Sequence, residues 1–154
     1  MKWVTREKAR VDRIACPWLI RKFVDPEAEF LYVPREKLGE VVQREKAIPF
    51  DTPGAEIFRF QENGQDHVSF DALIRKYGLK DPALLELAKI VRVADGGSGN
   101  EPVPAGLEAA ATGSRQIAHD VRENQRLQFP LYEALYAYCK WKVEEHGKLE
   151  LSGC

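Results

Sequence analysis

The sequence has no long hydrophobic segment and no marked excess of charge of either sign. No apolar run approaches the roughly 20 residues of a membrane span, and the first eight residues, MKWVTREK, are charged where a signal peptide would be apolar. We therefore expect a cytoplasmic protein with no membrane segment. Lys and Arg number 23 against 24 Asp and Glu, a net charge of -1, so no overall attraction to nucleic acid or to an anionic membrane is expected.

Cysteine and histidine are also scarce. The three cysteines, Cys16, Cys139 and Cys154, are far apart and form no CxxC pair. This spacing indicates neither a disulfide framework nor a zinc knuckle. The glycine-rich stretch Gly96–Gly99 lacks the GK[ST] ending of a phosphate-binding loop, so we interpret 95–102 as a connector.

The 154 residues, 44% of them hydrophobic, fit one globular domain over 1–154. Strand-like segments alternate with helical ones in the first 60 residues, and helical periodicity dominates afterwards. The predicted strands are 3–5, 30–33, 48–50 and 57–60. The predicted helices are 17–24, 36–45, 69–77, a segment from Pro82, 105–127 with a break at Gly113-Ser114, and 130–145. The fold class is therefore α+β, with an α/β-like N-terminal half, a small mixed sheet covered by helices, and a helical C-terminal half.

Local signals mark several element ends. Asn63-Gly64 is typical of a turn, and Ser69 is a candidate helix cap. Gly78 can close the helix over 69–77, and Asp81-Pro82 is typical of a helix start.

The segment from Asp12 to Pro26 carries the most suggestive chemistry. Pro17 suits the first position of a helix, which places Cys16 near the cap. The unpaired N–H groups at such an end would stabilise a thiolate or, with Arg13 and Arg21, receive an oxyanion. Cys16 is then a candidate redox thiol, and the alternative is a small buried apolar residue.

A second candidate site could bind a metal ion. His119, Asp120 and Glu123 form a compact group in which His119 and Glu123 share a helical face. If His67 joined them, the set would suit zinc or iron and leave positions open for substrate. The alternative is that His119, Asp120 and Glu123 are ordinary surface residues that bind no metal.

The predicted helix over 105–127 also carries a basic stripe, and the last helix is rich in aromatic residues. Arg115 and Arg122, seven residues apart, would share the face of this stripe with Arg126 and His119. Such a stripe could receive an anion if it faced Arg13, and a solvated face is the alternative.

The aromatic residues of the last helix favour core packing or a dimer interface over base stacking. They are Phe129, Tyr132, Tyr136, Tyr138 and Trp141.

Several blocks, in order, resemble the C-terminal domain of ChrB, the bacterial chromate-resistance protein. The longest are WVTR at 3–6, DRIACPWLIRKF at 12–23 and DPEA at 25–28. The likeness continues through IPFD at 48–51, SFD at 69–71, YGL at 77–79, DPAL at 81–84, IVR at 90–92 and YEALY at 132–136. The resemblance implies a role in bacterial chromate resistance and supplies no catalytic residue set. The longer family members look like regulators with a separate N-terminal region, and this chain leaves no room for one, so no nucleic-acid partner is expected.

Three readings of function follow from the sequence. The preferred one is a stand-alone domain that binds chromate or a similar oxyanion through Arg13, Arg21, Arg115 and Arg122, with Cys16 as a redox thiol. The second is a metal-dependent enzyme that uses His67, His119, Asp120 and Glu123. The third is a dimerisation or partner-binding module built on the aromatic last helix, which includes a homodimer.

Overall fold

A three-stranded parallel sheet organises the first third of the chain. The computed structural model describes residues 1–8, 11–99 and 104–152. The central strand, β1, pairs in parallel with a neighbour on each side, giving the order β2-β1-β3. The strands are β1 (Lys2–Arg6), β2 (Glu29–Val33) and β3 (Ile48–Pro49). Each parallel pair requires a crossover, and helices supply both of them.

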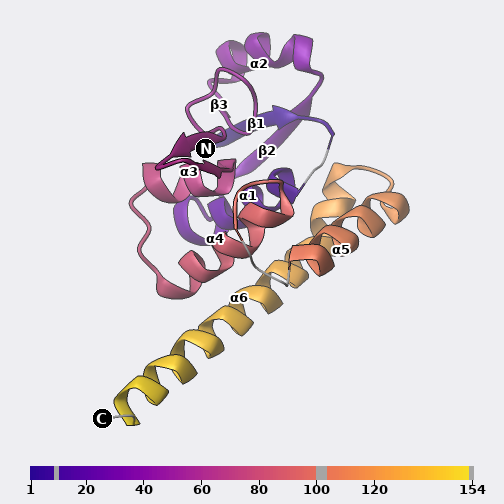
Figure 1. The fold of residues 1–154 in the computed structure, drawn as a ribbon. Coiled ribbons are helices and arrows are strands. Elements are labelled where there is room, and N and C mark those ends of the chain that lie inside the picture. The colour runs from indigo at the N-terminus through magenta and orange to yellow at the C-terminus, as the bar shows by residue number, and fades with distance from the viewer. Residues whose placement is uncertain (9–10, 100–103, 153–154) are drawn as a thin grey trace.

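The two faces of the sheet are covered by different helices because side chains alternate along β1. Trp3 lies in the main hydrophobic core, on the side of the N-terminal helix α1 (Val11–Leu19). Val4 points the other way and packs with Val41 of α2 (Leu38–Glu45). Figure 1 shows α2 above the sheet and α1 below it.

Helix α1 begins earlier than predicted. It starts at Val11, so Pro17 lies inside it rather than at its first position. Proline has no N–H to donate to the carbonyl of Arg13, and its ring crowds that carbonyl. The helix continues after Leu19 as a π-helical segment, η1 (Ile20–Val24), before Pro26. Such widened turns accommodate interruptions of the regular hydrogen-bond ladder.

A hairpin and four helices complete the fold and confirm the α+β prediction. The remaining elements are η2 (Arg35–Lys37), β4 (Phe60–Glu62), β5 (Gln65–His67), α3 (Ser69–Lys76), α4 (Pro82–Ala94), α5 (Pro104–Ile117) and α6 (Val121–Ser152). Asn63 and Gly64 have φ angles of 53° and 74°, which suits the tight turn between the antiparallel strands β4 and β5. Asp81 caps α4 by accepting from the N–H of Leu84, as predicted. Gly78, at φ 59°, follows the end of α3.

The two C-terminal helices differ from the prediction in where they break. The chain stays helical through Gly113 and leaves the helix only after Ile117. Asp120 then accepts from the N–H of Glu123 and caps α6. Helix α6 runs on through Pro130, so the predicted start at 130 is wrong.

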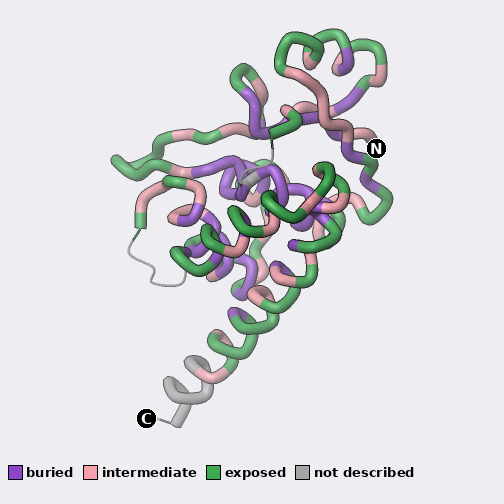
Figure 2. The backbone as a smooth tube through the Cα atoms, turned by 90° about the vertical axis from the view of Figure 1, so that its right-hand side faces the viewer, coloured by how far each residue is buried: buried purple, intermediate pink, exposed green. Residues whose placement is uncertain are grey.

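Helix α6 extends away from the rest of the molecule. The part up to Cys139 packs on α1 and α4, where Tyr132 and Cys139 are buried. Beyond that contact the helix leaves the body, and residues 140–145 are mostly exposed (Figures 1 and 2). Within the described part of the chain, no helix is both long and apolar enough to cross a membrane.

Candidate functional site

A cavity lies where the three parallel strands end. Its volume is about 510 Å³, and it is lined by residues that follow each strand in turn. Arg6 to Lys8 follow β1, Pro34 to Glu36 follow β2, and Asp51 and Pro53 follow β3. The carboxyl edge of a parallel sheet is where open α/β folds place their ligand sites.

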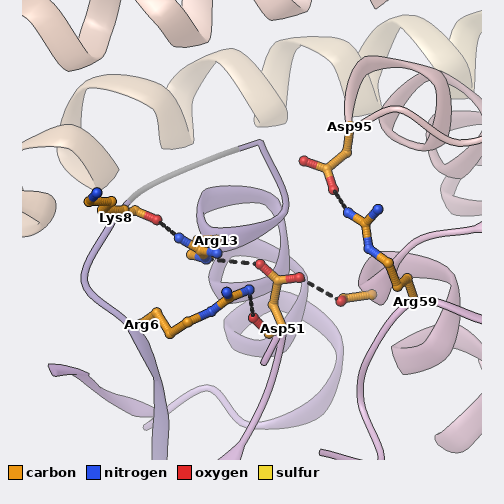
Figure 3. Close-up of polar contacts among 7 residues, drawn as sticks. Arg6, Lys8, Arg13, Asp51, Arg59 and Asp95 are labelled. Atoms are coloured by element: carbon orange, nitrogen blue, oxygen red, sulfur yellow. Dashed lines mark hydrogen bonds and ion pairs between the residues drawn. The ribbon is translucent and has the colours of Figure 1, made fainter. Parts of the chain in front are cut away.

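A buried ion pair forms the floor of this cavity. The Nε of Arg13, in the first turn of α1, lies 3.0 Å from Oδ2 of Asp51, and each side chain is only 6% exposed. Arg13 also donates through Nη1 to the backbone carbonyl of Lys8. The other carboxylate oxygen of Asp51 accepts from the hydroxyl of Ser69 at 2.8 Å. Asp51 and the carbonyl of Lys8 therefore fix the Arg13 guanidinium, and Ser69 in turn fixes the carboxylate of Asp51 (Figure 3).

Arg6 reaches the same residue through the backbone. Its Nη2 donates to the carbonyl oxygen of Asp51 at 3.0 Å. Asp51 has a φ of 50°, a left-handed conformation that costs energy in a residue other than glycine. Two guanidinium groups thus converge on one residue, Arg13 on its side chain and Arg6 on its main chain (Figure 3).

The rim of the cavity carries charges of both signs. The basic side chains are Lys8, Arg35 and Arg59, and the acidic ones are Glu7, Glu36 and Asp95. Arg59 pairs with Asp95 at 3.5 Å, so this pair is neutral, as is the pair on the floor. With Arg6 included, five basic and four acidic side chains line the cavity. The cavity therefore has a small net positive charge.

The predicted position of Cys16 at a helix N-terminus is wrong. Cys16 is the sixth residue of α1 and is completely buried in the main core. It lies among apolar residues that include Trp18 and Leu19. This is the alternative given from the sequence, a small buried apolar residue. Its redox role stays a prediction, and its burial gives that role no support.

The four predicted anion-binding arginines do not meet in one site. Only Arg13 lines the cavity at the sheet edge. Arg21 lies over the ring of Phe30, 5.0 Å from its centre. Arg115 lines another cavity beside α5, and Arg122 a hollow near β2. The predicted stripe is interrupted because α5 ends before His119, so Arg115 and Arg122 lie on different helices.

The predicted metal site is not formed either. No three His, Cys, Asp or Glu side chains come together in a metal-binding group among the described residues. His67 stacks on Phe60 with ring centres 4.8 Å apart, and its Nδ1 is 3.5 Å from Asp71. The carboxylate of Asp71 is committed to Arg92, with two contacts of 2.9 Å. This carboxylate raises the pKa of Arg92. His119 is an exposed residue just before α6. Asp120 and Glu123 lie at the start of that helix, where the carboxylate of Asp120 accepts from the N–H of Glu123.

Sequence reasoning missed most of the cavity lining. The missed residues include Arg6, Lys8, Arg35, Asp51, Arg59 and Asp95. One signal was available for the first four: each directly follows a predicted strand or lies within three residues of its end. If those strands are taken as parallel, the residues after them meet at one edge.

Comparison with known proteins gives the family. The model of the ChrB C-terminal domain matches residues 3–139. Protein ChrB of Cupriavidus metallidurans is 39% identical over 117 residues, which are 75% of this chain and 33% of that protein. The chain thus corresponds to about a third of that relative's length. No solved structure matches the chain. Since the family model covers nearly all of the chain, this protein belongs to the ChrB C-terminal domain family.

Proposed function

We propose that this domain binds a tetrahedral oxyanion of the chromate type in the cavity at the carboxyl edge of the sheet. The observation that carries the proposal is the convergence of Arg6 and Arg13 on Asp51, with Lys8 and Arg35 on the rim. Guanidinium groups bind oxyanions through two parallel hydrogen bonds, and a fixed guanidinium loses little freedom on binding. Arg13 is also in the first turn of α1, the helix end that favours an anion.

The proposal concerns binding and does not include reduction by a thiol. Chromate is both a dianion and an oxidant, but the thiol of Cys16 has no exposed surface. The likeness of this chain to its family implies a role in chromate resistance. In this proposal, that role depends on recognition of the anion. The cytoplasmic location expected from the sequence is part of the same proposal, since a chromate-binding protein must meet the anion where it accumulates.

Binding of sulfate and chromate to purified protein at low ionic strength tests the proposal directly. Sulfate has the same shape and charge and is not an oxidant, so titration calorimetry with sulfate measures recognition alone. We expect Arg6→Gln and Arg35→Gln each to weaken both anions about tenfold or more, the loss of one charge-assisted contact.

The matched control is Arg44→Gln. Arg44 is an exposed residue of α2 that pairs with Glu40, and its substitution makes the same change in net charge. If Arg44→Gln weakened the anions as much as Arg6→Gln, the effect would be one of overall charge and the proposed site would be wrong. Absence of binding by the unaltered protein at millimolar sulfate and chromate would also overturn the proposal.

A partner-binding role for α6 is the second candidate. Tyr138 and Trp141, whose ring centres are 6.3 Å apart, are 42% and 59% exposed on either side of the buried Cys139 of α6. Exposed neighbouring aromatic residues are typical of interfaces. Light scattering across protein concentrations tests self-association, and Trp141→Ala should abolish any dimer that is found. A monomer at every concentration would remove the homodimer reading.

A further inference from the structure

A second cavity of about 430 Å³ lies beside the anion cavity and has a different chemistry. Its walls come from the end of α4, one face of α5 and one residue of α6. Asp95 lines both cavities, which places them side by side. The polar residues of the second cavity are Asp95, Glu108, Thr112, Arg115 and Gln128. Its volume is in the range of small-molecule sites.

Gln128 provides the strongest sign that this cavity has a ligand. The residue is only 1% exposed, and its amide nitrogen donates to Oδ1 of Asn124 at 2.6 Å. Its amide oxygen is buried and has no hydrogen-bond partner among the described residues. Buried acceptors are nearly always satisfied in native proteins. An N–H donor from a bound molecule would satisfy this one.

Helix α5 presents opposite charges at a fixed spacing along the cavity. Glu108, Thr112 and Arg115 follow the i, i+4, i+7 pattern, so they share one face of the helix. The rise per residue places the Cα atoms of Glu108 and Arg115 about 10 Å apart along the axis. Arg115 donates to the hydroxyl of Thr112 at 3.3 Å, which steers its guanidinium along that face. Glu108 has no ion-pair partner within the described parts of the chain.

We propose that this cavity binds a short zwitterionic peptide of about three residues. Its ammonium group pairs with Glu108, a peptide N–H donates to the amide oxygen of Gln128, and its carboxylate pairs with Arg115. An extended chain spans about 3.3–3.6 Å per residue, so a tripeptide matches the spacing of the two residues along α5. The inference is independent of oxyanion binding in the neighbouring cavity.

Triglycine is the probe, because it carries both charged ends and no side chain. Calorimetry or chemical-shift titration of the full chain at low ionic strength should detect triglycine at millimolar concentration or below. N-acetyl-triglycine lacks the ammonium group, and triglycine amide lacks the carboxylate. Each should bind about two- to fivefold more weakly than triglycine, the loss expected for one exposed ion pair. No binding of triglycine, or equal binding of all three peptides, would overturn the proposal.

Substitutions at two exposed residues test which end of the peptide each residue binds. In Glu108→Gln, triglycine and its N-acetyl form should bind equally, because the residue that recognises the ammonium group has lost its charge. In Arg115→Gln, triglycine and its amide should bind equally for the corresponding reason. If either variant kept the full discrimination of the unaltered protein, the assigned orientation would be wrong.

Matched controls separate this site from the fold and from the anion cavity. Glu86→Gln on α4 makes the same charge change as Glu108→Gln at a residue that pairs with Lys89, and it should leave triglycine binding unchanged. Glu108→Gln should bind sulfate as the unaltered protein does, whereas Arg6→Gln should bind triglycine normally. A loss of triglycine binding in Glu86→Gln equal to that in Glu108→Gln would refute the specific site.

Discussion

Replacement of Asp51 by Asn tests the central contact of the anion cavity. Asn has the same shape and is among the residues that best tolerate a positive φ, so the backbone at φ 50° is preserved. The Asn side-chain oxygen can still accept from the hydroxyl of Ser69, as Oδ1 of Asp51 does. The changes are the loss of the negative charge 3.0 Å from the Nε of Arg13 and the replacement of Oδ2, which accepts from that Nε, by an NH2 group that can only donate.

The expected cost is large because the pair is buried. Both side chains are 6% exposed, and removal of one partner of such a pair leaves an uncompensated charge that costs about 3–5 kcal/mol. A domain of this size is stable by about 5–15 kcal/mol in total. Urea unfolding followed by tryptophan fluorescence should therefore show a much lower midpoint for Asp51→Asn with a similar slope.

An anion should restore part of this loss. In Asp51→Asn the positive charge of Arg13 is no longer neutralised, so sulfate should bind more tightly than to the unaltered protein. Sulfate at 100 times its Kd stabilises the folded state by roughly 2.7 kcal/mol. At one fixed sulfate concentration, the variant should therefore gain more stability than the unaltered protein.

The control for this experiment is Glu40→Gln, which removes one partner of an exposed pair. Glu40 and Arg44 are 68% and 60% exposed, so the cost should be about 0.5 kcal/mol or less. If Asp51→Asn lost no more stability than Glu40→Gln, the buried pair would not stabilise the fold. If sulfate stabilised the variant and the unaltered protein equally, Arg13 would not be part of an anion site.

Three other substitutions give further checks. In a Cys154→Ser background, Cys16 and Cys139 should react with a thiol reagent only at the rate of unfolding, because both are buried; rapid labelling of Cys16 in the native protein would contradict this. Burial and the hydrogen bond to Asp81 raise the pKa of Tyr136 from 10.0 to about 12. The folded pKa is above the unfolded one, so Tyr136 contributes stability that is fully present below pH 10 and is lost as pH rises toward 12. Tyr136→Phe should therefore lose less stability than the unaltered protein between pH 9 and 11 in urea unfolding. Asp71→Asn removes the carboxylate that binds Arg92 twice and accepts from the N–H of Val68. It should cost about 3 kcal/mol in the same assay, whereas Glu56→Gln, at the exposed pair with Lys76, should cost well under 1 kcal/mol.

The elements predicted well from the sequence are those specified by neighbouring residues. Asn63-Gly64 gives a tight turn because both residues accept positive φ. Asp81-Pro82 starts a helix because the carboxylate caps it and proline needs no donor at the first position. In both cases the physical cause lies within four residues of the feature.

The elements predicted poorly depend on tertiary contacts. Pro130 is typical of a helix start, yet α6 continues through it because its neighbours Phe129 and Leu131 pack against the core. Ser69 is a candidate cap by residue type, whereas its hydroxyl donates to the carboxylate of Asp51. The helix break expected at Gly113-Ser114 occurs after Ile117, where Asp120 caps the next helix. The last of these has a local signal, since Asp120 and Glu123 have the spacing of a helix N-terminus.

The family-specific block around Cys16 shows why a site is harder to predict than an element. Arg13 and Cys16 are three residues apart on α1, close enough to be neighbours on one face, yet Arg13 lines the cavity at the sheet edge and Cys16 is buried in the apolar core. The partner that fixes Arg13 is Asp51, 38 residues away, and only the parallel pairing of β1 with β3 brings it near. No local pattern contains that pairing. The consequence for function is that basic side chains, Lys8 and Arg35 among them, are available at the cavity, while the thiol of Cys16 is not. Recognition of an oxyanion by charge is reversible and leaves the protein chemically unchanged. Oxidation of Cys16 would first require the hydrophobic core around α1 to open.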